Sequence, residues 1–140
     1  MRVVLDTNVV LDLVAFRDPG VEPLRAAIEA KRVAVVTSVD CLDEFRRVLG
    51  YPEFRLDAGR QADAFRWFET RAERAPAPPP QPLLPQCRDA DDQKFLDLAW
   101  VSRVDFLVTK DRALLDLARR VAELKRFLVS SPTDVAWPPA

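Results

Sequence analysis

The stretch VVLDTNVVLDLV, residues 3 to 14, decides the fold. Its first half is a short run of branched apolar residues, which is typical of a strand buried on both faces. Asp6 interrupts this run, and Asn8 follows where a helical pattern begins. Burying an unpaired carboxylate is costly, so Asp6 indicates either the cap of a helix or a functional site.

The alternation of strand and helix continues along the whole chain. Strands of this kind, separated by helices of ten or more residues, pair in parallel through right-handed crossovers. We therefore predict an α/β fold, a three-layer α/β/α sandwich with a central parallel sheet of four to five strands, forming a single domain over residues 1–140. The pattern predicts strands at 2–6, 33–37, 104–109 and 127–131, and helices after Asp6 with a break at 18–20, then at 22–30, 38–49, 57–74, 89–102 and 111–124. The Pro-rich segment 75–85 predicts extended structure, with a short edge strand at most.

Missing residue types exclude several kinds of catalysis. The chain contains no histidine, which removes Ser-His-Asp and Cys-His catalysis and most zinc sites. Its three glycines cannot form a phosphate-binding glycine loop. Cys41 and Cys87 lack metal-type spacing, and we interpret them as free thiols. Any chemistry must therefore rely on carboxylates, together with a metal ion.

The overall composition is that of an ordinary globular chain. The formal net charge is −1, so composition alone does not indicate a nucleic-acid-binding protein. No apolar run approaches the roughly 20 residues that a membrane span needs, and the N-terminus lacks the features of a signal peptide. We expect a cytoplasmic protein that does not contact the membrane.

Two acids follow predicted strands directly. Asp6 ends the first strand, and Asp111 comes just after the strand at 104–109. In open parallel sheets, ligands bind outside the carboxyl ends of the strands. Both acids are also well placed to cap the next helix, so the cap remains an alternative interpretation for each.

Two further acids lie on predicted helices. Glu44 borders the apolar stripe of its helix, where a glutamate often simply reaches water. Asp92 heads the buried stripe of the helix that starts at Asp89, which is an unusual place for an acid. Asp89 and Asp91 stand beside Asp92, and either could supply the functional oxygen in its place.

The sheet rule brings Asp6, Glu44, Asp92 and Asp111 towards one edge of the sheet. Converging carboxylates raise one another's pKa and destabilise the fold unless a cation neutralises them. Oxygen ligands without histidine or cysteine favour Mg²⁺ or Mn²⁺ over zinc. Such sites hydrolyse phosphodiesters with water as the nucleophile.

Three blocks of this sequence resemble the PIN-domain family, and in particular its toxin branch, the VapC-like ribonucleases of toxin–antitoxin systems. The blocks occur in the family's order: VVLDTNVVLDLV (3–14), TSVDCLDEFRRVLGYPEF (37–54) and CRDADDQKFLDLAWVSRVDFLVTKD (87–111). The resemblance implies a parallel sheet between helices and a Mg²⁺- or Mn²⁺-dependent endoribonuclease. It also implies an RNA substrate and a cognate antitoxin protein as partners.

The resemblance assigns catalysis and metal binding to Asp6, Glu44, Asp92 and Asp111. It implies that Asn8 and Thr109 orient these carboxylates. Asp12, more than one helical turn beyond Asp6, is interpreted as a bystander. Two alternatives stay open: a PIN nuclease that processes RNA without an antitoxin, and a catalytically silent PIN fold that serves as a binding module.

Cations should surround an anionic site that RNA approaches. The candidates lie within a few residues of the proposed ligands, although each could equally belong to a solvated helix face: Arg46, Arg47, Lys94, Lys110 and Arg112. Phe65, Trp67 and Phe68 recur at helical spacing. We interpret them as core residues or as the face of a homodimer.

Overall fold

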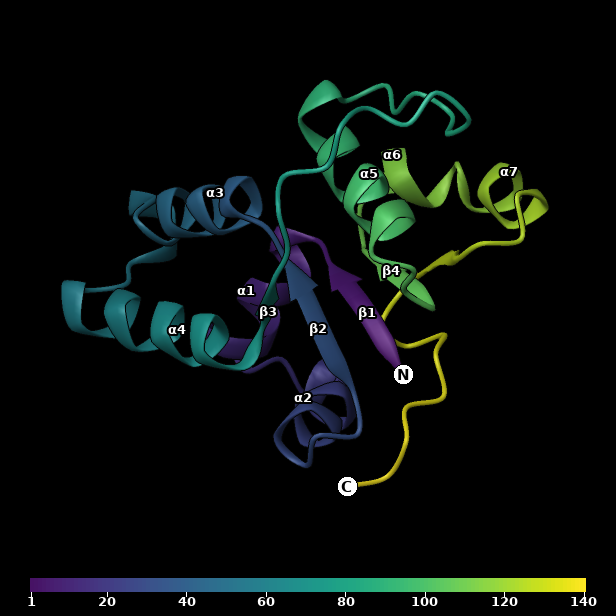
Figure 1. The fold of residues 1–140 in the computed structure, drawn as a ribbon. Coiled ribbons are helices and arrows are strands. Elements are labelled where there is room, and N and C mark those ends of the chain that lie inside the picture. The colour runs from purple at the N-terminus through teal and green to yellow at the C-terminus, as the bar shows by residue number, and fades with distance from the viewer.

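A five-stranded parallel sheet organises the computed structural model, which describes residues 1–140. The strands lie in the order β3-β2-β1-β4-β5, and Figure 1 labels the first four of them. Their bounds are β1 Arg2–Leu5, β2 Ala34–Thr37, β3 Glu73–Arg74, β4 Phe106–Val108 and β5 Leu128–Ser130. The predicted parallel sheet is confirmed, with the upper of the two expected strand numbers.

Helices cover both faces of the sheet and complete the predicted three layers (Figure 1). Their bounds are α1 Thr7–Val14, α2 Glu22–Glu29, α3 Val39–Leu49, α4 Ala58–Arg71, α5 Gln93–Val101, α6 Arg112–Leu115 and α7 Ala118–Glu123, with single 3₁₀ turns η1 Pro19–Val21, η2 Pro52–Phe54 and η3 Ala90–Asp92. Alternate residues of β1 supply the two cores, because successive side chains of a strand point to opposite faces. Val3 and Leu5 pack with α1 to α4, and Val4 packs with α5 to α7. None of the helices combines the length and the apolar character needed to cross a bilayer.

The strand order reverses its direction beside β1, where open parallel sheets form a ligand crevice. From β1 the chain adds β2 and β3 on one side, and then returns to add β4 and β5 on the other. Parallel sheets bind ligands where the winding direction reverses, outside the carboxyl ends of the strands. Here that point lies between β1 and β4, which pair through Val3 with Phe106 and through Leu5 with Val108.

The third strand differs from the sequence-based expectation. It lies at Glu73–Arg74, inside the segment predicted as helix, and the Pro-rich segment 75–85 contains no strand. The helix ends at Arg71 because the following residues pair with the free edge of β2, where the Ala75 amide donates to the Thr37 carbonyl at 2.8 Å. Pro76 has no amide hydrogen, so the ladder cannot continue.

The helix predicted at 111–124 is also divided. It forms α6 and α7, with residues 116 and 117 between them. The Leu117 amide donates to the carbonyl of Leu114 at 3.0 Å, a 3₁₀-type bond three residues back that tightens the chain at this point. Leu114 and Val121 are both buried to 0% exposure, one on each short helix. The bend therefore lets both helices pack against the sheet.

Candidate active site

Thr109 links the two acids that follow strands. Its Oγ1 donates a hydrogen bond to Asp6 Oδ2 at 2.5 Å and accepts one from the Asp111 amide at 2.9 Å. Thr109 is completely buried at the end of β4. The crevice between β1 and β4 thus holds Asp6 and Asp111 in a fixed relation through one hydroxyl group.

Asp6 is both a helix cap and a buried acid. Its Oδ1 accepts the Asn8 amide at 2.7 Å, which caps α1, and the residue is 4% exposed. Burial raises the pKa of Asp6, while the hydrogen bonds from Thr109 and Asn8 act in the opposite direction. Asn8 supports Asp6 through its backbone, since its side chain lies on the exposed surface. The two interpretations of Asp6 are therefore compatible.

The carboxyl groups of Asp92 and Asp111 form a close pair. Asp92 Oδ2 is buried and has no hydrogen-bond partner among the protein donors. Burial and the adjacent Asp111 raise the pKa of Asp92 to about 8, and interaction with Asp92 lowers the pKa of Asp111. Two carboxylates so close cannot both ionise without a compensating cation. Asp111 also caps α6, because its Oδ1 accepts the Ala113 amide at 2.9 Å.

The acid run before α5 contributes one further residue. Asp89, Asp92 and Asp111 each place a carboxylate oxygen within 4.8 Å of the others. Asp91 is exposed, and its backbone carbonyl accepts the Lys94 ammonium. Asp89 therefore joins Asp92 instead of replacing it, while Asp91 stays outside the group. The run of acids in the sequence indicated that Asp89 could belong to the site. The orientation of the Asp89 side chain depends on the turn η3, where Asp89 Oδ1 accepts a hydrogen bond from the Asp91 amide at 3.0 Å.

Glu44 lies near this group but has its own partners. The Thr7 hydroxyl donates to Glu44 Oε2, and Lys94 Nζ lies 2.8 Å from Glu44 Oε1. The Glu44 side chain is 14% exposed. Glu44 is outside the group of three acids that converge within 4.8 Å. Its negative charge is balanced by Lys94.

Asp12, interpreted from the sequence as a bystander, forms an ion pair in the structure. It is 9% exposed, and its carboxylate pairs with Lys110. The sequence could have indicated the burial of Asp12, because its neighbours Leu11 and Leu13 are core residues, exposed to only 2% and 0%. An acid between two core positions of a helix is held close to the core, where it needs a counterion.

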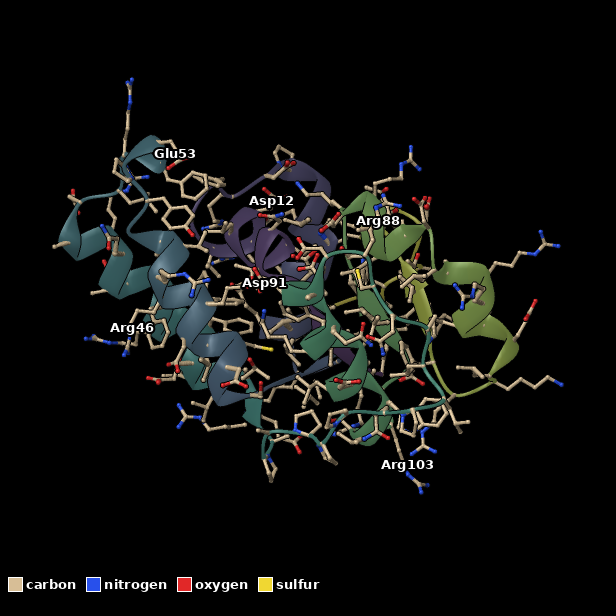
Figure 2. The ribbon with its side chains drawn as sticks, turned by 90° about the horizontal axis from the view of Figure 1, so that it is seen from above. Asp12, Arg46, Glu53, Arg88, Asp91 and Arg103 are labelled. Atoms are coloured by element: carbon tan, nitrogen blue, oxygen red, sulfur yellow. The ribbon has the colours of Figure 1, made fainter.

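The predicted RNA-positioning cations divide into three kinds. Lys94 and Lys110 are engaged in ion pairs with Glu44 and Asp12. Arg47 and Arg112 are exposed and have no acid within ion-pair distance. Arg46 is not brought to the acids: Figure 2, viewed from above, places it to one side of Asp12 and Asp91.

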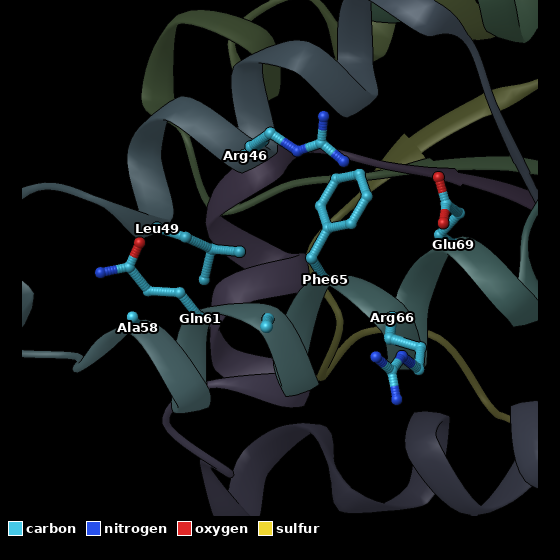
Figure 3. A pocket seen from close by; sticks show the side chains of 8 residues that line it. Arg46, Leu49, Ala58, Gln61, Phe65, Arg66 and Glu69 are labelled. Carbon is cyan, nitrogen blue, oxygen red and sulfur yellow. The ribbon is translucent and has the colours of Figure 1, made fainter.

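Arg46 instead lines a separate cavity between α3 and α4. The cavity has a volume of about 420 Å³, and the Arg46 guanidinium lies 4.1 Å from the centre of the Phe65 ring (Figure 3). Phe68, 4% exposed, belongs to the core and meets Phe45 edge-on at 5.5 Å. Trp67 is flanked by the guanidinium groups of Arg25 and Arg71, each 4.4 Å from its ring.

The acid group suits a hard divalent cation. All its donors are oxygens, the ligand type that Mg²⁺ and Mn²⁺ prefer. The buried Asp92 Oδ2 accepts no hydrogen bond, and burial together with the neighbouring acids raises the pKa of Asp92. A cation held by Asp92 and Asp111, with Asp89 beside them, would remove both sources of instability.

Comparison with known proteins gives a family and a fold. The model of the PIN-domain family matches residues 2–113. Among solved structures, the chain is similar to the crystal structure of VapBC2 from Rickettsia felis bound to a DNA fragment from their promoter. The TM-score is 0.60 at 13% identity, and the match covers 94% of this chain and 98% of that chain. No curated protein matches the sequence.

Proposed function

The chain belongs to the PIN-domain family, and from this premise we propose that it is a metal-dependent endoribonuclease. The observation that carries the proposal is Asp92 Oδ2, a buried oxygen that accepts no hydrogen bond although the acids Asp111 and Asp6 lie close enough to raise the pKa of Asp92. Natural proteins rarely bury an acceptor that nothing satisfies. A cation ligand in the crevice of a parallel sheet accounts for it.

Four aspartates have separate roles in this proposal. Asp92 and Asp111 hold Mg²⁺ or Mn²⁺, and Asp89 supplies an oxygen from the rim of the crevice. Thr109 and the Asn8 amide hold the Asp6 carboxylate in one orientation facing the pair. When bound, the ion supplies Lewis acidity that polarises the phosphodiester and favours deprotonation of water. The absence of histidine is no obstacle, because water is the nucleophile.

The RNA substrate would reach the acids across exposed cations. Arg47 stands one helical turn after Glu44 on α3; its pKa is raised mainly by the neighbouring Tyr51 side chain, and the acids Glu44 and Asp91 add to the effect. Arg112 opens α6 directly after Asp111. Neither guanidinium group is paired with an acid, so both could contact phosphate oxygens, which positions a strand without reading its bases.

We further propose that the nuclease is the toxin of a toxin–antitoxin pair. The support is the fold shared with a VapBC2 structure over nearly the whole of both chains. A cognate antitoxin, a cytoplasmic location and a homodimer belong to the same proposal. Growth arrest on expression, relieved by co-expression of the neighbouring small gene, tests it. Normal growth together with RNA cleavage would refute the toxin and keep the nuclease.

Cleavage of single-stranded RNA tests the nuclease itself. The wild type is expected to cleave with Mg²⁺ and to stop in EDTA. Asp92→Asn should lower the cleavage rate about 100-fold or more, which corresponds to about 2.7 kcal/mol or more of transition-state stabilisation. Asp63→Asn changes an exposed acid on α4 and should cleave like the wild type. Equal cleavage by all three proteins in EDTA would refute metal-dependent catalysis.

A further inference from the structure

Glu44 is the one acid of the predicted set whose two oxygens are both occupied by side-chain donors. Thr7 donates to Oε2, and Lys94 Nζ lies 2.8 Å from Oε1. The donors come from α1 and α5, separated from Glu44 by 37 and 50 residues along the chain. Glu44 is 14% exposed and Lys94 is 23% exposed, so this ion pair is largely shielded from water.

The other acids show the opposite situation. Asp89, Asp92 and Asp111 approach one another within 4.8 Å. Of the ion pairs in the structure, none involves Asp89, Asp92 or Asp111, and the nearest neighbour that shapes the pKa of Asp92 is another carboxyl group, that of Asp111. Positive charge is therefore missing at Asp92 and present at Glu44.

The Lys94 ammonium is held much as a bound cation would be. It contacts two oxygens, Glu44 Oε1 and the backbone carbonyl of Asp91. Lys94 is the second residue of α5, and Asp92 is the residue just before this helix. The start of α5 therefore fixes the position of Lys94 relative to Asp92. An ammonium has three donors, and two of them have oxygen partners here.

We propose that Lys94 takes the place of a second metal ion, so that the site works with one divalent ion on Asp92 and Asp111. The inference rests on the proposed nuclease function. Paired carboxylate sites often hold two ions that stabilise the attacking and the leaving oxygens of the phosphate. Here the lysine provides the second positive charge from within the chain, independently of the metal concentration. Glu44 accordingly acts as a positioning residue for Lys94.

The number of Mn²⁺ ions bound per chain tests this directly. It is measured by electron paramagnetic resonance of the unbound ion at millimolar Mn²⁺, on the full chain. The wild type should bind one ion. Lys94→Met, which removes the charge and keeps the length, should bind two, and Lys94→Arg should again bind one.

Lys110→Met is the matched control. It also removes one lysine charge beside the acids, but its partner Asp12 lies outside the acid group. This variant should bind one ion. That result would show that the second ion in Lys94→Met occupies the position of the lost ammonium, and that a general loss of positive charge is not enough to bind it. Two ions in the wild type, or one ion in Lys94→Met, would overturn the inference and leave the nuclease intact. No ion in the wild type would refute the proposed function itself.

A second pair of variants keeps the test valid if Lys94→Met does not fold. Glu44→Gln should change the Mn²⁺ dissociation constant by less than about threefold, since Glu44 does not hold the ion. Asp92→Asn should weaken it beyond the roughly 10–100-fold that loss of a supporting residue costs. An equal loss of affinity in both variants would make Glu44 a metal ligand and overturn the inference.

Discussion

Asp6 and Asp111, which are 105 positions apart, are joined through the single hydroxyl group of Thr109. The hydroxyl donates to Asp6 Oδ2 at 2.5 Å and accepts the Asp111 amide at 2.9 Å. A hydroxyl group can donate and accept at the same time. The bond that it donates orients the Asp6 carboxylate, and the bond that it accepts fixes the backbone at Asp111, where the chain turns into α6. The carboxyl ends of β1 and β4 are thereby locked into one site.

Thr109→Val tests this link, since it removes the hydroxyl and keeps the shape. Leaving the buried Asp6 carboxylate without this donor should cost about 1–3 kcal/mol of unfolding free energy. Mn²⁺ affinity should fall roughly 10–100-fold, as for other residues that orient metal ligands. Denaturant unfolding and Mn²⁺ titration measure the two effects. Thr70→Val, which removes an exposed hydroxyl on α4 bonded to the Arg66 carbonyl, should leave Mn²⁺ affinity unchanged.

The stability of the metal-free protein should fall as the pH rises from about 4 to about 8. The pKa of Asp92 is raised from 3.8 to about 8, so in this window the folded state keeps a proton that the unfolded state releases. The raised pKa of Asp6 acts in the same direction. The lowered pKa of Asp111 matters only below the window, because its contribution is lost as the pH falls through values under 3.8. Melting temperatures in EDTA measure the slope.

Asp92→Asn should flatten that pH dependence, because the amide does not titrate. The slope that remains should be the smaller one caused by Asp6 and Asp97, whose pKa values burial also raises. An identical slope in the wild type and in Asp92→Asn would show that Asp92 is not the titrating group. Asp63→Asn, on the exposed face of α4, should keep the wild-type slope.

Mg²⁺ and Mn²⁺ should raise the melting temperature of the wild type at neutral pH. An ion at 100 times its dissociation constant stabilises the native state by about 2.7 kcal/mol. The gain should increase with pH, since the ion displaces the proton from Asp92. Asp92→Asn should lose most of the shift. A shift of equal size in both proteins would place the ion elsewhere.

The ion pair between Asp12 and Lys110 should respond asymmetrically to substitution. Lys110→Met leaves a carboxylate that is only 12% exposed without a counterion, whereas Asp12→Asn leaves a lysine that is 45% exposed to water. Lys110→Met should therefore destabilise the fold more. Both losses should stay below the roughly 3–5 kcal/mol for breaking a fully buried pair, because water screens the lysine. Urea unfolding of the two variants compares them, and the reverse order would contradict the burial argument.

Local pattern predicted most of the fold. Branched apolar runs identified β1, β2, β4 and β5, and helical spacing identified the helices between them, because both signals repeat within a few residues. The two residues of β3 carry no such signal. They form a strand because the free edge of β2 pairs with them after α4 ends. The division between α6 and α7 likewise follows from packing on the sheet.

The sequence by itself determined the chemistry available to this protein. A chain without histidine, with Asp6 at the end of a buried strand and Asp92 at the head of a buried stripe, is limited to oxygen ligands near one edge of a parallel sheet. Only the tertiary structure decided how the charges are divided among these acids. Lys94 pairs with Glu44, Lys110 pairs with Asp12, and Asp92 is left beside Asp111 without a cation. These pairings join residues far apart in the chain, and their strength depends on burial, which local sequence does not encode.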